Sequence, residues 1–213
     1  MSDVSVDRLM RFVLDMRQKG VTDARVLAAM EKTPRTHFAP PQFAAFALED
    51  RALPLGDGQQ MSSPSLVGRM LSALDLRGGE TVLDVGAGSG YQAAVLGTVA
   101  RRVVSLERRQ ALAAEARGKI GQLRTMHVYI HYADGAEGWA EEREFERIVV
   151  NAAIAVPPAR LVAQLATGGL MVAPTITDAG QRLMQFRKSV DGELVAVDAG
   201  AIALDPLESG LAP

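Results

Sequence analysis

The chain has 213 residues, of which 48% are hydrophobic, and its 23 lysines and arginines nearly balance its 25 aspartates and glutamates. This length suits one well-buried α/β domain and is short for two. The balance of charge excludes the broad positive field that holds a nucleic-acid backbone or an anionic membrane, so we expect neither partner. The absence of cysteine excludes disulfides, thiolate metal sites and a cysteine nucleophile.

Charges occur throughout the N-terminal segment, and no stretch approaches the ~20 apolar residues of a membrane span. We therefore expect a cytoplasmic protein that works in solution as a monomer. Apolar residues at helical spacing predict a first helix, which Gly20 ends, with its buried face at Val6, Leu9, Met10, Val13 and Leu14. Asp23 is the expected cap of a second helix, which Pro34 ends and whose apolar face is Val26, Leu27 and Met30.

Residues 34–64 are dense in Pro, Gly and Gln and show no sustained period. They predict an ordered connecting loop, which at this length is more often functional than idle. A helical segment, Leu66 to Leu76, follows it. We expect residues 1–76 to form N-terminal helices and a substrate-side loop, and residues 77–213 to form the core, within one compact unit.

From Thr81 onward, short apolar runs alternate with helical segments, which predicts a mostly parallel sheet with helices on both faces, the Rossmann-like form of the α/β class. The predicted strands are Thr81 to Val85, Arg102 to Leu106, His127 to Tyr132, Arg147 to Asn151 and Leu170 to Pro174. The predicted helices are Tyr91 to Val99, Gln110 to Leu123 and Pro158 to Leu165. Asp191-Gly192 then predicts an antiparallel C-terminal hairpin.

The stretch TVLDVGAGSGYQAAVLG runs from a predicted strand through a glycine loop into a helix. Glycines permit a tight turn and close approach to a ligand, and the helix N-terminus offers free amide donors. A dinucleotide site needs a third glycine where this chain has Tyr91. The observed spacing is typical of methyltransferases that bind S-adenosylmethionine. The predicted cofactor-binding residues of this stretch are Asp84, Gly86, Ala87, Gly88, Ser89 and Gly90.

Two acidic residues follow the next two strands. Glu107 lies close to the ~20-residue offset at which a carboxylate accepts hydrogen bonds from ribose hydroxyls. Asp134 is placed to accept a hydrogen bond from an adenine amino group, and Gly135 leaves room for the ring. Each is alternatively a solvated carboxylate at a strand end, but their position beside the glycine loop favours a nucleoside site.

With these residues in place, the chain resembles the protein-L-isoaspartate O-methyltransferases from about Gly20 to about Gly192. The most specific stretch is EDRALPLGDGQQMSSPSLV, which is similar to a pre-motif that general methyltransferases lack. Further matches are TPRTHFAP, SGYQAAVLG, SLER, DGAEGW and QLATGGLMVAP. The resemblance implies a class I methyltransferase fold, S-adenosylmethionine as donor with S-adenosylhomocysteine as product, and no metal. It also implies methylation of the free carboxyl of L-isoaspartyl and D-aspartyl residues in damaged peptides and proteins.

The pre-motif of this family implies the acceptor-side residues. Ser62 is the expected hydroxyl that orients the acceptor carboxylate, although a helix N-cap is the alternative for this serine. Gln59, Gln60, Met61 and Asn151 are expected on the substrate side. No catalytic base is required, because a carboxylic acid with a pKa of about 4 is already anionic at neutral pH.

The chain departs from the family pattern at Leu48, Gln60, Ser65 and Asn151, where the family tends to have Tyr, Thr, Tyr and Thr. These departures leave two alternatives open. One is a methyltransferase of the same ancestry with a different acceptor. The other is a non-catalytic protein that binds S-adenosylmethionine, against which the retained Ser62 and Gln59 argue.

Overall fold

The first helix packs inward through a face that only partly matches the one its sequence predicts. The computed structural model describes residues 3–123, 127–142 and 144–213, and its first element is α1 (Asp3–Gln18). Phe12 and Met16 are buried, whereas Met10 and Leu14 are each 56% exposed. The prediction that Met10 and Leu14 belong to the buried face is therefore wrong. The helix packs through the Leu9, Phe12, Val13 and Met16 stripe, since these positions are three and four residues apart.

The second helix, α2 (Ala24–Lys32), begins and ends as predicted. The carboxylate of Asp23 accepts hydrogen bonds from the backbone amides of Arg25 at 2.7 Å and Val26 at 3.4 Å, which are free at a helix N-terminus. Its predicted apolar residues are buried. α1 precedes it across Gly20, whose φ of 91° is the left-handed conformation that ends many helices.

The segment predicted as a loop contains short ordered elements. These are α3 (Arg35–Phe38), a 3₁₀ helix η1 (Pro41–Phe46), and the antiparallel strands β1 (Leu53–Gly56) and β2 (Gln59–Met61). The two strands are joined by Gly56-Asp57-Gly58, all with positive φ. The hairpin leads directly into α4 (Pro64–Ala73), which covers most of the predicted helix after it.

The central sheet has seven strands in the order β5-β4-β3-β6-β7-β8-β9. Strands β3 to β7 run parallel, and β8 and β9 complete the sheet as an antiparallel pair across the predicted turn. The strands are β3 (Thr81–Val85), β4 (Arg102–Glu107), β5 (Val128–Tyr132), β6 (Phe145–Val150), β7 (Leu165–Thr177), β8 (Gly180–Lys188) and β9 (Leu194–Ala201). The predicted α/β fold is confirmed, and only β7 is much longer than predicted.

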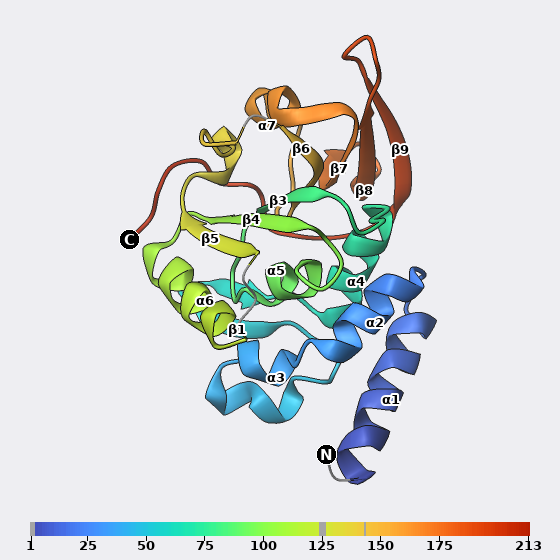
Figure 1. Cartoon of the computed structure of the whole chain (residues 1–213), viewed down its shortest axis with the longest axis vertical. Coiled ribbons are helices and arrows are strands. Elements are labelled where there is room, and N and C mark those ends of the chain that lie inside the picture. Colours follow the sequence, from blue (N-terminus) through green and yellow to red (C-terminus); the bar gives the residue numbers. More distant parts are fainter. Residues whose placement is uncertain (1–2, 124–126, 143) are drawn as a thin grey trace.

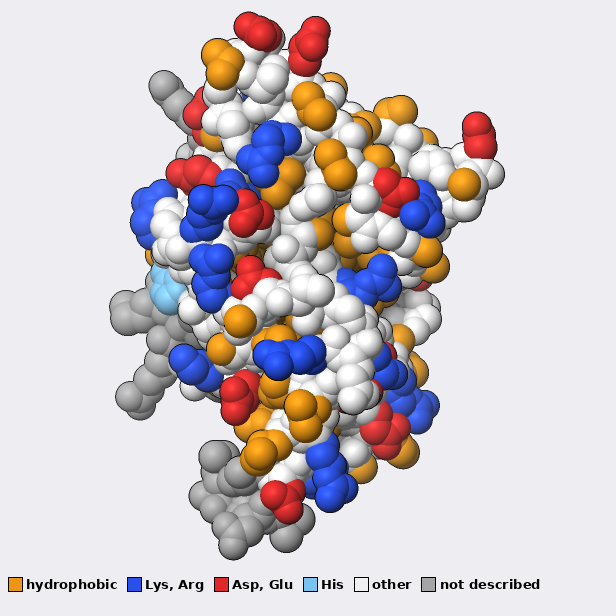
Figure 2. Space-filling model, turned by 90° about the vertical axis from the view of Figure 1, so that its right-hand side faces the viewer, with side chains coloured by type: hydrophobic (Ala, Val, Ile, Leu, Met, Phe, Trp, Pro, Cys, Tyr) orange, Lys and Arg blue, Asp and Glu red, His pale blue; other side chains and the backbone are white. Residues whose placement is uncertain are grey.

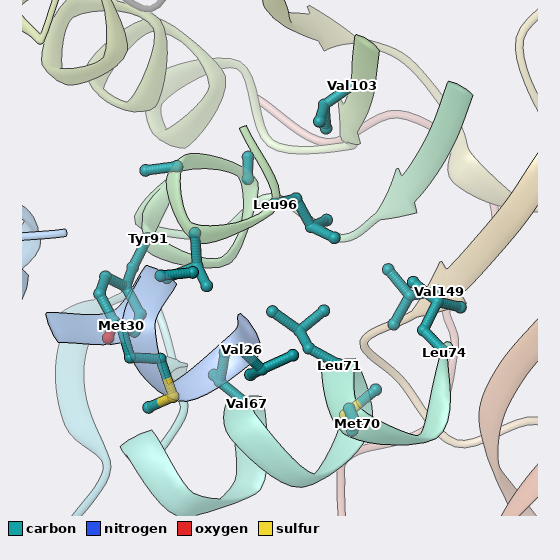
Figure 3. Close-up of a cluster of buried hydrophobic side chains, with 14 of the residues drawn as sticks. Val26, Met30, Val67, Met70, Leu71, Leu74, Tyr91, Leu96, Val103 and Val149 are labelled. Carbon is teal, nitrogen blue, oxygen red and sulfur yellow. The ribbon is translucent and has the colours of Figure 1, made fainter. Parts of the chain in front are cut away.

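Helices cover both faces of this sheet, as Figure 1 shows. Successive residues of β3 enter different cores because side chains alternate along a strand: Val82 packs in the larger core and Leu83 in the smaller one. Figure 3 shows the larger core, where Val26, Leu71 and Tyr91 converge from α2, α4 and α5. The helices that follow the strands are α5 (Tyr91–Leu96), α6 (Gln110–Gln122), η2 (Gly135–Glu137) and α7 (Ala159–Gln164).

After β9 the chain returns past β6 and β4 toward β5 (Figure 1). Pro206 pairs with Ala153 just after β6, and Ala212 pairs with Arg109 just after β4. The side chain of Arg108 holds this return segment by donating to the carbonyl of Gly210 at 2.8 Å and by pairing with Glu208. The last part of the chain therefore lies across the carboxyl ends of the parallel strands.

Positive and negative side chains are interspersed on the molecular face shown in Figure 2. This distribution agrees with the nearly balanced composition. Among the helices of the described residues, none is both long enough and apolar enough to cross a membrane.

Candidate functional site

A cavity of about 940 Å³ lies at the carboxyl ends of β3, β4 and β6. Ligands of open α/β sheets bind at this edge, where loops from several parallel strands meet. The glycine loop forms one wall, residues 58–63 form a second, and the return segment at residues 203–208 forms a third. The cavity therefore brings together segments that are far apart in the sequence.

Four of the five predicted loop residues line this cavity, namely Gly86, Ala87, Gly88 and Ser89. Gly90 does not line the cavity and packs against α6 instead. Its φ is 86°, and a Cβ at this position would come within 3.1 Å of the Cβ of Ala116. The loop is tied to the neighbouring strand by the amides of Gly86 and Ala87, which both donate to the carbonyl of Leu106.

Asp84 lies fully buried below the glycine loop and is not part of the cavity wall. Its carboxylate accepts three hydrogen bonds, from the Ser105 hydroxyl at 2.6 Å, the Gln92 amide at 2.9 Å and the Asn151 amide at 2.8 Å. Burial raises the pKa of Asp84 to about 6, although these three donors favour the charged form. At neutral pH the loop therefore sits above a largely ionised carboxylate.

Glu107 ends β4 and lines the cavity while remaining only 6% exposed. One carboxylate oxygen accepts from the amide of Gly88 at 2.8 Å, and the other accepts from the amide of Arg109 at 2.9 Å. These bonds fix both oxygens at the end of the strand. Because a carboxylate oxygen has two lone pairs, each retains capacity for a further donor.

Asp134 and Gly135 take different positions. Gly135 lines the cavity, and a Cβ there would lie 2.4 Å from a methyl carbon of Val85. Asp134 stands just behind the wall, where its carboxylate caps η2 by accepting from the amide of Ala136 at 2.9 Å. Its other oxygen accepts from the amide of Gly210 in the return segment. Asp134 thus joins the third parallel strand to the C-terminal wall.

The four predicted residues Gln59, Gln60, Met61 and Ser62 lie together on the cavity wall. The helix that follows begins at Pro64, and its N-cap is Ser63, which makes no side-chain capping bond. The alternative that Ser62 is the N-cap is therefore wrong. The capping hydrogen bond comes instead from Asp50, whose carboxylate accepts from the backbone amide of Ser65 at 2.9 Å.

The four departures from the family pattern do not form one group in space. Gln60 and Asn151 line the cavity, whereas Leu48 packs against the larger core. Ser65 serves Asp50. Burial opposes the ionisation of Asp50, but hydrogen bonds from the backbone and side chain of Ser65 and from Lys19 outweigh it, and the pKa of Asp50 is lowered. Two of the four departures thus contribute to the framework behind the wall.

Sequence reasoning did not identify several residues of this site. Gln92 and Ser105 hold Asp84, and Gln92 also lines the cavity. Gln92 lies two residues after the glycine loop, so its position carried a usable signal. The return segment at residues 203–208 was not predicted to line the site, because its place in the wall depends on how the chain folds back after β9.

The cavity is rich in fixed carboxylates and backbone amides. Within the ranges that the structure describes, no group of three or more His, Asp or Glu side chains is arranged to hold a metal ion. The buried side-chain oxygen Oε1 of Gln92 has no hydrogen-bond partner among the described residues. Together with the negative charges of Glu107 and Asp84, this arrangement suits a cationic ligand that carries hydrogen-bond donors.

Comparison with known proteins identifies the family of this architecture. Residues 8–211 match the family described as protein-L-isoaspartate(D-aspartate) O-methyltransferase. A protein-L-isoaspartate O-methyltransferase of Rhodospirillum centenum is 44% identical over 208 residues, which cover 97% of this chain and 94% of the relative. The enzyme of that name from Cereibacter sphaeroides is 46% identical over 187 residues, covering 87% of this chain and 85% of the relative.

Solved structures support the same fold. A Plasmodium falciparum protein in complex with S-adenosyl-L-homocysteine superposes with a TM-score of 0.78 at 20% identity, covering 93% of this chain and 97% of that one. A solved protein-L-isoaspartate O-methyltransferase gives a TM-score of 0.82 at 24% identity, covering 95% of this chain and 67% of that one. With the sequence match extending over nearly its whole length, the chain belongs to the protein-L-isoaspartate(D-aspartate) O-methyltransferase family.

Proposed function

We propose that this protein transfers the methyl group of S-adenosylmethionine to the free carboxyl of L-isoaspartyl residues, and of D-aspartyl residues, in damaged proteins and peptides. Methylation of that carboxyl is the first step of repair. The observation that carries the proposal is the single cavity in which the family's glycine loop and its acceptor-side pre-motif face each other. We extend the proposal to an enzyme that works as a monomer in the cytoplasm.

The donor side of the cavity suits S-adenosylmethionine. When bound, this cofactor supplies an electrophilic methyl group on a positively charged sulfur. Glu107 offers two fixed carboxylate oxygens at the end of β4, where the ribose hydroxyls are expected. Asp84 places a negative charge beneath the glycine loop, and Gln92 offers an unpartnered oxygen beside it. We assign cofactor binding to these residues together with residues 86–89 and Gly135, which line the cavity. Gly90 and Asp134, also expected to bind the cofactor, do not line it and support the wall from behind.

The acceptor side has less chemistry to perform. An isoaspartyl carboxyl is anionic at neutral pH because its pKa is about 4, so it is already a nucleophile. The chain must align this carboxylate and exclude water from it. Ser62 lines the cavity, and among the described residues only its backbone carbonyl has a hydrogen-bond donor, so its hydroxyl is available to an acceptor. We assign Ser62 as the orienting residue, with Gln59, Gln60 and Met61 on the substrate side. Asn151 was expected there too, but its side-chain amide donates to Asp84 and to the glycine loop, so we assign it to the donor side.

A second candidate function is methyl transfer to another acceptor. It is favoured by one observation, that Gln60 and Asn151 depart from the family pattern and line the cavity. Both side chains are larger amides where the family tends to have threonine. They alter the hydrogen-bond donors and the space that an acceptor meets. A different acceptor therefore remains the main competitor to isoaspartyl repair.

One assay separates these functions. Purified protein is incubated with methyl-labelled S-adenosylmethionine and a peptide that contains one isoaspartyl residue, with the otherwise identical aspartyl peptide as control. We expect label in the isoaspartyl peptide only. Binding of S-adenosylmethionine by calorimetry, without transfer to the isoaspartyl peptide, would leave the different-acceptor and non-catalytic functions standing.

A further inference from the structure

Arg35 is a buried cation with no role in the function proposed above. It begins α3, within the segment TPRTHFAP that precedes the acceptor-side motif. Its side chain is only 1% exposed, and it does not line the cavity. Arginine is almost never buried to this degree unless its guanidinium is hydrogen-bonded.

The partners of this guanidinium are three backbone carbonyls. Nη1 donates to the carbonyl of Ala47 at 2.6 Å. Nη2 donates to the carbonyl of Arg51 at 3.2 Å and to that of Ser62 at 2.9 Å. The three acceptors belong to a segment of the chain that leaves the 3₁₀ helix, forms the β1–β2 hairpin and ends at the cavity. One side chain thus joins the start of this segment to Ser62, which lies in the acceptor-side wall.

The guanidinium also reaches the donor side. Its central carbon lies 5.7 Å from the centroid of the Tyr91 ring, and Tyr91 is the first residue of the helix after the glycine loop. A cation at this distance from an aromatic face is attracted to it. Arg35 therefore contacts both motifs that face each other across the cavity, although it touches neither ligand site itself.

Stability alone is a poor explanation for a cation at this position. Burial lowers the pKa of Arg35 to about 10, so the group remains charged at neutral pH. Taking such a charge out of water is costly, and apolar residues of similar volume often stabilise a protein equally well. Charged, planar donors do provide something that apolar residues lack, namely fixed directions to several acceptors at once.

We propose that Arg35 is a positioning residue of the methyl-transfer site, which holds the backbone of Ser62 in register with Ala47 and Arg51 and thereby sets where the Ser62 hydroxyl meets the acceptor carboxylate. The kinetic part of this inference rests on the proposed function. The structural part, that Arg35 orders the Ser62 segment, does not depend on which reaction the protein performs. A displacement of about 1 Å at a reacting group is enough to reduce a rate about 100-fold.

Arg147 is a matched control for Arg35. It is also a buried arginine, with 8% exposure, and it also donates to three backbone carbonyls, those of Leu74, Asp75 and Glu146. It lies near the start of β6, at the end of the sheet opposite the cavity, and does not line it. Lysine at either position keeps the charge and loses the planar set of donors.

The experiment compares Arg35→Lys with Arg147→Lys. For Arg35→Lys we expect kcat on the isoaspartyl peptide to fall at least tenfold, with the Kd for S-adenosylhomocysteine within twofold of the parent protein. For Arg147→Lys we expect a similar loss of thermal stability and kcat within twofold. Equal losses of kcat in the two variants, or a parallel loss of S-adenosylhomocysteine affinity in Arg35→Lys, would overturn the inference.

A second measurement does not depend on activity. Amide hydrogen exchange, read by mass spectrometry, should become faster across residues 47–63 in Arg35→Lys and stay unchanged there in Arg147→Lys. Unchanged exchange in this segment would refute a positioning role. If the parent protein methylates no isoaspartyl peptide, the proposed function fails, and the exchange result alone decides whether Arg35 orders the Ser62 segment. If Arg35→Lys does not fold, Arg35→Gln takes its place in both measurements.

Discussion

The side-chain amide of Asn151 donates a hydrogen bond to the buried carboxylate of Asp84 at 2.8 Å. The same amide group is 3.1 Å from the carbonyl of Gly86, so it fastens the glycine loop to the acid beneath it. Asn151 was expected on the substrate side, and it does line the cavity. Its bonds, however, point to the donor side, where a threonine of the family pattern has no amide to offer.

Asn151→Ala should therefore change the binding of the methyl donor more than the choice of methyl acceptor. The loss of both bonds leaves Asp84 with one donor fewer, which costs about 1 to 3 kcal/mol in the free energy of unfolding and loosens the loop. We expect weaker binding of S-adenosylhomocysteine in calorimetry and an unchanged preference for the isoaspartyl over the aspartyl peptide. A loss of preference with donor affinity intact would place Asn151 on the acceptor.

Glu107→Ala should weaken binding of both S-adenosylmethionine and S-adenosylhomocysteine by about 1.5 to 3 kcal/mol, because hydrogen bonds to a charged acceptor are lost. Calorimetry measures this directly, and NAD should not bind the parent protein. Glu137→Ala is the control, since Glu137 is exposed and does not line the cavity. Unchanged affinity in Glu107→Ala would remove this residue from the donor site.

Ser62→Ala should lower kcat on the isoaspartyl peptide by ~10²-fold, the usual effect of losing one positioned donor, and leave donor affinity within about twofold. The adjacent Ser63 also lines the cavity and makes no capping bond to α4, so it tests whether the effect belongs to Ser62 or to any hydroxyl on this wall. Ser63→Ala should change kcat far less. If donor binding fell in parallel with kcat in Ser62→Ala, the serine would be structural and its assignment wrong.

Asp84 should make stability depend on pH. Its pKa is about 6 in the folded protein and 3.8 when exposed, so the folded state binds its proton more tightly. The stability from this proton is complete below pH 3.8 and is lost as the pH rises through 6. Relative to Asp84→Asn, the free energy of unfolding should fall by roughly 2 kcal/mol between pH 4 and pH 7, since each pKa unit corresponds to about 1.4 kcal/mol and part of the effect lies below pH 4. Urea unfolding at several pH values measures this difference, and a constant difference would contradict the buried ionisation.

The acceptor wall offers the sharpest test of substrate. Gln60 lines the cavity and Ser65 does not, so Gln60→Thr should change peptide methylation more than Ser65→Tyr. If the departures merely repack one pocket, the parent protein methylates the isoaspartyl peptide and ignores its aspartyl isomer. If the pocket is retuned, restoring both residues should raise isoaspartyl activity well over tenfold. No activity in the parent or in the double variant, with S-adenosylmethionine still bound, would contradict the repair function.

The sheet was predictable because its signals are local. The central strands β3 and β6 are short apolar runs that are buried almost throughout, and a helical segment follows each of them. The hairpin β1–β2 was missed although Gly56-Asp57-Gly58 is a turn signal. Its strands are very short, and Pro54 interrupts the alternation by which strands are detected. For α1, Met10 and Leu14 have helical spacing, but the positions of α2 and α4 decide which stripe is buried.

The candidate site was predictable where a motif brings its residues together in sequence. The glycine loop is one continuous stretch of sequence and residues 59–62 are another, and both contribute to the cavity wall. The bonds of Asp84 to Gln92, Ser105 and Asn151 join three different elements, so they depend on strand order and register. The same holds for Arg35, whose three carbonyl partners are 12 to 27 residues away along the chain.

The return of the chain after β9 has a consequence for biosynthesis. Residues 203–208 supply a wall of the cavity, yet no strand of the seven-stranded sheet lies beyond Ala201. A ribosome that has completed β9 has thus provided the whole sheet while the ligand cavity still lacks one side. A nonsense mutation or proteolytic cut just after Ala201 would separate the two properties, leaving a fragment that retains every strand of the sheet with an incomplete cavity.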